Sequence, residues 1–310
     1  MILTVTLNTA LDLTYAVPAL VPHSSHRVSE VTERPGGKGV NVARVLSALG
    51  HDTVVTGFAG GSTGTVLREL LGALPQGPTD ALVTVAGNTR RTLAVVDRSS
   101  GDTTQLNEPG PHIGAGEWAA FLGTFRDLLP QAVAVALCGS LPPGVHVGAY
   151  AELVRLARSA EVPVLLDTGG EPLRRGIAAR PDLVKPNAEE LAQLTGAREP
   201  LRATRDARRR GAHSVVTSLG PDGLLAVTPD GIWRAAPPAA VRGNPTGAGD
   251  SAVAGLLSAL AEGLGWQDRL ARAVALSTAT VLAPAAGEFD REAYEDLLPR
   301  VAVEQHTPAA

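Results

Sequence analysis

The stretch Asn244-Pro245-Thr246-Gly247-Ala248-Gly249-Asp250-Ser251 stands directly before an apolar, alanine-rich run, Ala252–Leu264. Two glycines around one small residue let successive backbone N–H groups converge, and a helix that begins there adds the positive end of its dipole. Such a hollow binds an anion, most often a phosphate. The carboxylate of Asp250 would be repelled there unless its task is to remove a proton from the group that attacks the phosphate. The stretch therefore indicates phosphoryl transfer.

Two other interpretations fit the same stretch. A glycine turn in which Asp250 only caps the helix explains the local sequence equally well. The run 247–252 also fits the dinucleotide fingerprint G-x-G-x-x-A, but that fingerprint must follow a strand directly. Arg242-Gly243-Asn244-Pro245 precedes it, which is typical of a loop. The nicotinamide interpretation is therefore excluded, and the helix cap stays open.

Length and composition indicate a globular α/β enzyme. A chain of 310 residues with 44% hydrophobic residues can bury a full core, as one large domain or two smaller ones. A net charge of −4 gives no reason to expect nucleic acid or an anionic membrane as a partner. The single cysteine, Cys138, excludes an intrachain disulfide and lies in an apolar run, so we expect an inert core residue.

The two ends of the chain carry separate expectations. Met1–Leu7 reads as a strand and not as a leader, and no apolar run reaches the roughly 18 residues of a membrane span. We therefore expect a cytoplasmic protein. The last residues, about 305–310, are expected to form a frayed tail.

Lysine is rare in this chain. Of 27 basic residues only Lys38 and Lys185 are lysines, and each stands in a dense motif. A general preference for arginine explains the imbalance. Since arginine is tolerated elsewhere, these two positions are interpreted as requiring a compact ammonium group and not a planar guanidinium.

Short apolar strands alternate with helices from about residue 114 onward. This rhythm predicts a mostly parallel sheet with helices on both faces. Strands are expected at 2–7, 53–58, 132–137, 162–166, 182–184 and 214–218, and helices at 40–49, 65–74, 116–129, 147–160, 188–195, 202–210, 247–263 and 266–282. The arginines of 198–210 are interpreted as a solvated helix face and not as a nucleic-acid site.

Two pairs of segments with alternating polarity, 13–17 with 26–33 and 91–97 with 103–106, do not fit this scheme. We interpret them as a small separate β-sheet that folds over a site as a lid. The chain is then one domain, 1–310, with a core of about 1–11, 35–88 and 109–304. The lid insertions cover about 12–34 and 89–108.

Further glycine-rich motifs flank the predicted helices. Gly36–Asn41 is not a Walker A loop, because Thr32 and Gly39 stand where that loop needs glycine and Ser or Thr. A substrate-contacting turn remains, with Lys38 and Asn41 as donors. In Lys185–Glu190, Asn187 and Glu190 fit a helix capping box and a hydrated magnesium site equally well.

Four loops complete the set of candidate contacts. Gly139–Gly144 and Asp167–Gly170 follow strands, at the edge where open α/β sheets bind ligands. Ser218–Gly223 lies between two strands and also fits a plain hairpin turn. Asn107–Gly110 is placed as a hinge of the lid. Arg90 and Arg91 are neighbours on one strand, so at most one of them faces the cleft.

Taken in order, these motifs resemble the PfkB carbohydrate kinases of the ribokinase-like superfamily. Each motif is weak alone, but the ordered set spans nearly the whole chain and is specific. The matching residues are Thr6-Leu7-Asn8 with Ala10 and Asp12, then Gly36–Asn41, Asn107–Gly110, Gly139–Gly144, Lys185–Glu190 and Gly247–Asp250. Thr9, Gly169 and Asn244-Pro245-Thr246 depart from the residues usual in this family.

The resemblance implies a role for each motif. Asp250 would deprotonate the acceptor, while the amides of Gly247, Ala248 and Gly249 stabilise the transferring group. ATP and Mg²⁺ are the implied cofactors. The acceptor would be held by Asp12, Gly37, Lys38, Asn41, Arg27, Arg90, Glu108 and Ser140. ATP would lie along Lys185, Asn187, Ser218, Gly220, Gly223 and Thr246, with magnesium near Asn187 and Glu190.

The resemblance is strongest to the branch of 1-phosphofructokinase and tagatose-6-phosphate kinase. The form Gly39–Arg44, the Asn-Glu-Pro-Gly segment and the Ser-Leu-Pro-Pro-Gly loop carry it. It implies phosphorylation of fructose 1-phosphate to fructose 1,6-bisphosphate. Tagatose 6-phosphate or fructose 6-phosphate is the second choice, and another sugar or nucleoside the third. The rival is a non-catalytic sugar-phosphate-binding regulator. A homodimer through the outer face of the lid is expected.

Overall fold

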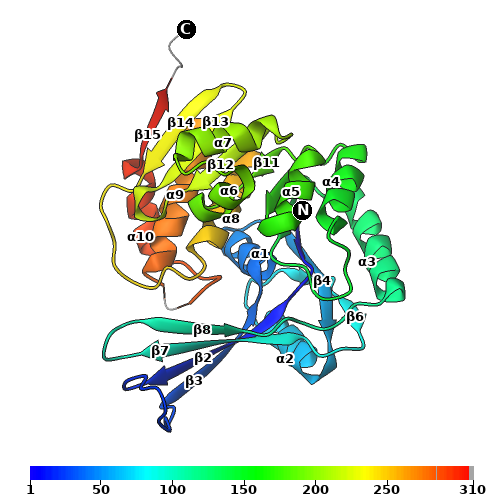
Figure 1. Ribbon diagram of the computed structural model, residues 1–310, viewed down its shortest axis with the longest axis vertical. Coiled ribbons are helices and arrows are strands. Elements are labelled where there is room, and N and C mark those ends of the chain that lie inside the picture. Colours follow the sequence, from blue (N-terminus) through cyan, green and yellow to red (C-terminus); the bar gives the residue numbers. More distant parts are fainter. Residues whose placement is uncertain (284, 307–310) are drawn as a thin grey trace.

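An 11-stranded sheet forms the centre of the computed structural model, which describes residues 1–283 and 285–306 (Figure 1). Its order is β15-β14-β13-β12-β11-β10-β9-β1-β4-β5, and β6 also pairs with β4. The pairs from β12 to β15 are antiparallel, and the others are parallel. The strands are β1 (Ile2–Thr6), β4 (Thr53–Gly60), β5 (Thr79–Asp80), β6 (Val83–Val85), β9 (Ala134–Cys138), β10 (Val164–Asp167), β11 (Leu183–Val184), β12 (Ser214–Ser218), β13 (Leu224–Thr228), β14 (Gly231–Ala236) and β15 (Ala302–His306).

Helices cover both faces of this sheet, as predicted. Along β9, Val135 and Leu137 join one apolar cluster, whereas Ala134, Ala136 and Cys138 join another, so the strand is buried on both sides. The helices are α1 (Lys38–Ala48), α2 (Gly61–Gly72), α3 (Ala115–Leu128), α4 (Ala149–Ser159), α5 (Gly170–Ala178), α6 (Ala188–Thr195), α7 (Pro200–Arg209), α8 (Ala248–Ala261), α9 (Trp266–Val281) and α10 (Arg291–Leu297). The expectation that Cys138 is a core residue is confirmed, since its side chain is fully buried.

A second, four-stranded sheet lies below the core in Figure 1, and we call it the lid. Its order is β3-β2-β7-β8, in which β2 and β7 run parallel and the outer pairs antiparallel. The strands are β2 (Ala10–Val17), β3 (Glu30–Gly36), β7 (Arg90–Asp97) and β8 (Thr103–Asn107). The predicted separate small sheet is confirmed.

Several local predictions are wrong or incomplete. The strand expected over 26–33 begins only at Glu30, so 26–29 belong to the loop between β2 and β3. Helices α5 and α10 and strands β14 and β15 were not expected. In the predicted frayed tail, Gln305 and His306 belong to β15, which pairs with β14; residues 307–310 lie outside the described part of the chain.

The topology brings the candidate residues to one edge of the sheet. The carboxyl ends of parallel strands β1, β9, β10 and β12 meet there. Helix α1 begins beside the end of β1, since a Cβ on Gly39 would lie 2.7 Å from the Val5 carbonyl oxygen. None of the helices within 1–283 and 285–306 combines the length and apolarity needed to cross a membrane.

Candidate active site

The glycine-rich stretch forms the start of α8. Gly247 adopts φ +86°, and a Cβ there would stand 2.7 Å from the Cα of Ala286, so both conformation and space favour glycine. Helix α8 begins at the next residue, and Asp250 lies in its first turn. The sequence predicted this helix start, and the N–H groups of the first turn have no partners within the helix. The geometry is therefore that of an anion-binding helix terminus.

Asp250 is buried and held by one strong contact. Its side chain accepts a hydrogen bond from Asn41 Nδ2 at Oδ2, over 2.9 Å. Burial raises the pKa of Asp250 to about 6, against the opposing charges of Lys38 and Lys185. A carboxylate with this pKa is ionised at neutral pH and more basic than an exposed one. It can therefore serve as a general base.

Both lysines of the chain meet at one carboxylate. Lys38 Nζ lies 3.3 Å and Lys185 Nζ 3.7 Å from Asp167 Oδ1, at the end of β10. Asp167 is only 1% exposed, and its charge is the main cause that raises the pKa of Lys38. A Cβ on Gly249 would lie 3.6 Å from Lys185 Nζ, so this ammonium group also borders the start of α8. The inference that both lysines serve special positions agrees with this convergence.

The sequence reasoning named Asp167 only as the first residue of the candidate loop Asp167–Gly170. It assigned no role to the Asp167 carboxylate. The available signal was its position: it is the last residue of a buried parallel strand, where a charged side chain points into the ligand edge. Its burial is recognisable only once the two lysines are seen to neutralise it.

Asn187 and Glu190 form the capping box at the start of α6. Asn187 Oδ1 accepts from the Glu190 N–H over 2.8 Å, and Glu190 Oε2 accepts from the Asn187 N–H over 2.9 Å. Glu190 Oε1 would lie 3.2 Å from a Cβ on Gly169, so glycine leaves room beside this oxygen. The capping interpretation is confirmed, and the metal role stays a prediction.

The oxygens near Glu190 suit magnesium. Asp167 Oδ2 is buried and has no hydrogen-bond partner among the described residues. Mg²⁺ is bound in proteins by one or two carboxylates together with waters and substrate phosphates. The oxygen donors of Asp167, Asn187 and Glu190 therefore fit such an ion.

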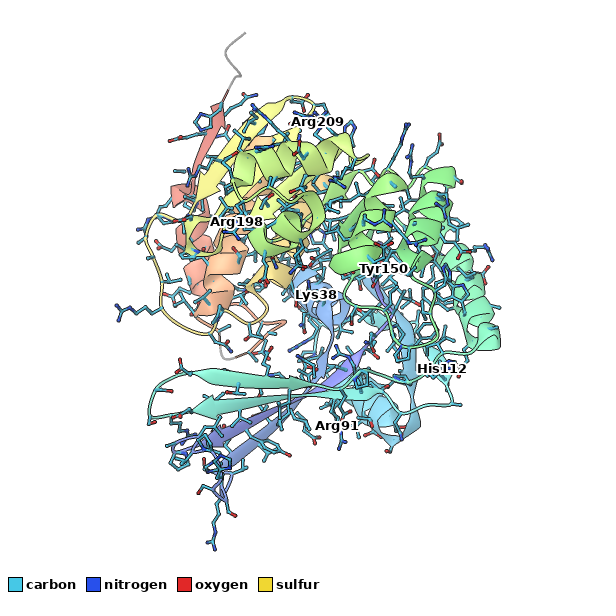
Figure 2. The ribbon with its side chains drawn as sticks, in the orientation of Figure 1. Lys38, Arg91, His112, Tyr150, Arg198 and Arg209 are labelled. Atoms are coloured by element: carbon cyan, nitrogen blue, oxygen red, sulfur yellow. The ribbon has the colours of Figure 1, made fainter. Side chains whose placement is uncertain are left out.

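An open cavity of about 790 Å³ brings together several residues expected to hold the acceptor. Asn8 Nδ2 donates to Ser140 Oγ over 3.1 Å, and Arg90 Nε donates to the Asn8 carbonyl over 3.2 Å. Lys38 lines the same cavity, and Figure 2 shows it between the core and the lid. Arg90 and Lys38 thus line one cavity.

Asp12 and Thr246 share a smaller cavity, of about 80 Å³, between the lid and the start of α8. Burial raises the pKa of Asp12 to about 6, while Thr92 and Arg90 oppose the shift. Thr246 was predicted on the ATP side. The structure places it on the lid side, beside Asp12.

Arg27 does not take the expected place, and Glu108 takes it with its carboxylate already paired. Arg27 was expected on a lid strand facing the cleft, but it is exposed in the loop between β2 and β3. Glu108 lies at the hinge and lines the cavity of about 790 Å³ with Lys38 and Arg90. Its carboxylate accepts from the backbone N–H and the guanidinium of Arg91, at 2.8 Å each. Figure 2 shows Arg91 on the far side of the lid from Lys38. The expectation that only one of Arg90 and Arg91 faces the cleft is confirmed.

Three of the six residues expected to bind ATP lie along a second cavity, which Lys185, Gly223 and Thr246 do not line. It measures about 880 Å³ and is lined by Asn187, Ser218 and Gly220 together with apolar side chains. The segment after Ser218 is a short 3₁₀ turn that joins β12 and β13, so the hairpin interpretation is also correct. Gly223 adopts φ +84°, and a Cβ there would collide with the Ala235 carbonyl oxygen. It shapes the turn and does not line this cavity.

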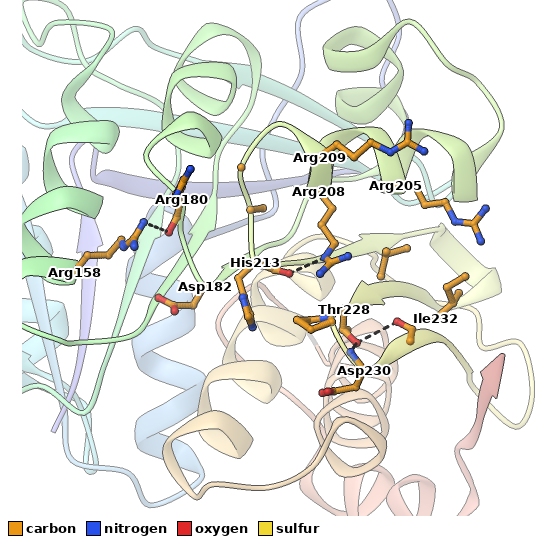
Figure 3. Close-up of a pocket in the computed structure, with 15 residues that line it drawn as sticks. Arg158, Arg180, Asp182, Arg205, Arg208, Arg209, His213, Thr228, Asp230 and Ile232 are labelled. Carbon is orange, nitrogen blue, oxygen red and sulfur yellow. Dashed lines mark hydrogen bonds between the residues drawn. The ribbon is translucent and has the colours of Figure 1, made fainter. Parts of the chain in front are cut away.

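The opposite edge of the sheet holds a cavity of about 950 Å³ with several arginines (Figure 3). Arg158 Nη1 donates to the carbonyl oxygens of Ala179 and Arg180, just after the end of α5. Arg208, in the last turn of α7, donates from Nε to the His213 carbonyl. Arginines at helix C-termini offset the helix dipole and the free carbonyls. Arg158 and Arg208 therefore have a structural explanation.

Comparison with known proteins identifies the family. The profile of the pfkB family carbohydrate kinases matches residues 4–292. The chain belongs to this family. It is 39% identical over 291 residues to a 1-phosphofructokinase of Rhodobacter capsulatus, covering 91% of this chain and 92% of the relative. This carbohydrate kinase therefore carries the predicted fold and class of activity.

Solved structures agree with this assignment. A Thermotoga maritima protein described as a possible 1-phosphofructokinase superposes with a TM-score of 0.90 at 29% identity, over 99% of this chain and 100% of the other. Phosphofructokinase-2 of Escherichia coli reaches 0.88 at 28% identity, over 96% and 98%. A ribokinase of Arabidopsis thaliana reaches 0.73 at 22% identity, over 96% and 98%, and shows the shared fold alone.

Proposed function

We propose that this kinase transfers the γ-phosphoryl group of ATP to a hydroxyl of a ketohexose phosphate, with fructose 1-phosphate as the preferred acceptor. The product is then fructose 1,6-bisphosphate. The observation that carries the proposal is the placement of Asp250: a buried carboxylate at the start of α8, held by Asn41 and flanked by two lysines.

In this mechanism Asp250 accepts the proton of the attacking hydroxyl. Asn41 fixes Oδ2 through its Nδ2–H donor, which leaves Oδ1 for the acceptor. The N–H groups of Gly247, Ala248, Gly249 and Asp250 would stabilise charge on the transferring group, because they have no partners in the helix; that of Ala248 also donates to the Pro245 carbonyl over 3.2 Å. Lys185, beside Gly249, adds positive charge at the same point.

Mg²⁺ would bind at the side-chain oxygens described above. Glu190 and Asn187 would hold it, and Asp167 Oδ2, which has no hydrogen-bond partner among the described residues, is a further candidate oxygen. When bound, the ion neutralises phosphate charge and helps to align the transferring group. Asp167 also pairs with Lys38 and Lys185. The two lysines would supply positive charge against the phosphates, and Asp167 holds them in place.

The acceptor would lie between the core and the lid. Arg90 and Lys38 provide cations for its phosphate, Ser140 and Gly37 provide neutral contacts, and Asp12 accepts from a sugar hydroxyl. The named activity of the Rhodobacter relative supports fructose 1-phosphate. Tagatose 6-phosphate and fructose 6-phosphate are the next candidates, and another sugar or nucleoside comes after them. ATP would lie in the cavity of Asn187, Ser218 and Gly220, against Lys185.

The lid also offers a surface for a homodimer. Val31 on β3 is 56% exposed and Leu106 on β8 is 58% exposed. Pairing two lids would bury such side chains and relieve their contact with water. A dimer by light scattering is expected, and a monomer at working concentration contradicts this part of the proposal.

The test is ADP release with Mg-ATP and a panel of acceptors: fructose 1-phosphate, fructose 6-phosphate, tagatose 6-phosphate, fructose and ribose. We expect the highest kcat/KM with fructose 1-phosphate. A preference for unphosphorylated sugars would remove the assigned roles of Arg90 and Lys38 in phosphate binding. Tight binding of a sugar phosphate without turnover would favour the regulator, although a regulator has no need for a buried base.

A further inference from the structure

The carboxylate of Glu288, between α9 and α10, contacts both the lid and the core. Glu288 Oε1 accepts from Arg34 Nε over 2.9 Å and from Arg44 Nη2 over 3.0 Å. Arg34 lies on lid strand β3, and Arg44 lies on core helix α1. One oxygen atom therefore bridges a lid strand and a core helix.

The lid end of this bridge lies beside Asp12. In the β2–β3 pair, Arg34 stands directly opposite Asp12, and both line the cavity of about 80 Å³ next to Thr246. The Arg34 side chain is 26% exposed, so its pairing with Glu288 is partly shielded from water. Fixing Arg34 thus fixes the part of β3 that supports Asp12.

The core end of the bridge lies beside the base. Arg44 follows Asn41 by one turn of α1, and Asn41 donates to Asp250. The Arg44 side chain is 6% exposed and also donates to the Ala286 carbonyl over 3.0 Å. Ala286 packs against Gly247, because a Cβ added to Gly247 would lie 2.7 Å from the Cα of Ala286. The same segment is therefore held against the anion-binding turn.

We propose that Glu288 is a positioning residue that sets the lid relative to the catalytic base through its shared contact with Arg34 and Arg44. The inference rests on the proposed function for the roles of Asp12 and Asp250. The bridge itself rests only on the contacts above. Without the carboxylate, the buried Arg44 loses its counter-charge and Arg34 loses its anchor.

The first test compares Glu288→Gln with the wild type in hydrogen exchange, without substrates. We expect faster exchange of the β3 amides over 30–36 and unchanged exchange in the central strands of the core. The matched control is Glu30→Gln, since Glu30 pairs with Arg98 on the same lid but with 64% and 55% exposed side chains. That control should leave exchange over 30–36 and turnover unchanged.

The second readout is kinetic. With the acceptor that gives the highest turnover, Glu288→Gln should raise its KM and lower kcat/KM by about tenfold, while the KM for ATP stays within about twofold. A general loss of folding would instead lower the fraction of active enzyme, without this difference between the KM for the acceptor and the KM for ATP. Equal changes for both substrates would overturn the positioning role.

Arg34→Gln separates lid anchoring from core stability, because it leaves Glu288 and Arg44 paired. If Arg34 acts through Glu288, the double variant should lose about as much kcat/KM as one single variant. Additive losses, or unchanged exchange over 30–36 in Arg34→Gln, would overturn the proposal; this variant serves even if Glu288→Gln does not fold. If exchange responds as expected but no panel acceptor is phosphorylated, the bridge stands and the proposed function fails.

Discussion

The two edges of the central sheet both carry charged cavities, but their charges are held for different reasons. At the carboxyl edge, helices α1, α6 and α8 begin, and Asp250, Asp167 and Lys185 are buried among them. At the amino edge, helices α4, α5 and α7 end, and Arg158 and Arg208 bind carbonyl oxygens. The larger cavity lies at the amino edge. Cavity size therefore does not locate this site, whereas buried and incompletely paired charge does.

The largest effect is expected for Asp250→Asn. Loss of the general base should lower kcat about 10³-fold, because proton transfer typically contributes 10²–10⁴-fold. Steady-state ADP release with the preferred acceptor measures this. The matched change at the other edge, Arg208→Gln, should leave kcat within about twofold of the wild type. Equal losses at both edges would break the comparison.

The Asp250→Asn variant should be more stable than the wild type at alkaline pH. The folded pKa of Asp250 is raised from 3.8 to about 6, so its contribution favours folding below pH 4 and is lost as pH rises through about 6. At pH 8 the Asp250→Asn variant, neutral at this position, should gain up to about 3 kcal/mol in the free energy of unfolding, from roughly two pKa units at 1.36 kcal/mol each. Urea unfolding at pH 8 and pH 4 measures the difference, which should vanish at the lower pH.

Lys185→Arg should cost about 10²-fold in kcat/KM although it keeps the charge, an effect of the size seen when positioning groups shift by about 1 Å. The ammonium is 4% exposed and lies between Asp167 and Gly249, and a planar guanidinium is larger and presents its donors in a different geometry. Arg155→Lys, at an exposed position of α4, is the control and should have no effect. Wild-type turnover in Lys185→Arg would show that only charge matters there.

The pH dependence of kcat/KM should report the ionisation of the carboxyl groups at the carboxyl edge. Asp250 and Asp12 both have pKa values raised to about 6 by burial, so kcat/KM should fall as pH drops below 6, with two protons involved. In Asp12→Asn only one proton should remain in the profile. A profile that stays flat down to pH 5 would contradict the assignment of a base with a raised pKa.

The smallest effect is expected at the amino edge. Arg158→Ala removes two hydrogen bonds to carbonyl oxygens after α5 and should lower the free energy of unfolding by about 1 kcal/mol. Kinetic constants should not change. A loss of activity without a loss of stability would give this edge a function of its own.

The sequence was sufficient for the regular core and for the glycine turns. Continuous apolar strands and glycines at helix starts are local signals, so α1, α8 and β9 were predicted close to their observed bounds. Strand β15 was missed because its residues are mostly exposed and its pairing with β14 joins distant parts of the chain. Helix α5 was missed because it begins with Gly-Glu-Pro, although the first turn tolerates proline.

The site was predicted less completely than the fold. The glycines and Asp250, the carboxylate proposed as the base, follow from local chemistry, but the residues that pair with them do not. Asp167 became apparent only through its two lysines, and Glu288 only through two arginines far away in the chain. Arg27 was misplaced because alternating polarity continues into a loop where no strand forms. Long-range charge pairing leaves no periodic signal in a sequence.

The most direct test of the central claim is phosphorus NMR of the reaction of Mg-ATP with fructose 1-phosphate, run with the wild type and with Asp250→Asn. The account predicts that the wild type forms fructose 1,6-bisphosphate and that the variant forms none on the same time scale, while its calorimetric affinity for ATP stays within about twofold. Product formed at a similar rate by the variant would contradict Asp250 as the base. No product from the wild type, with transfer to another acceptor, would contradict the proposed substrate.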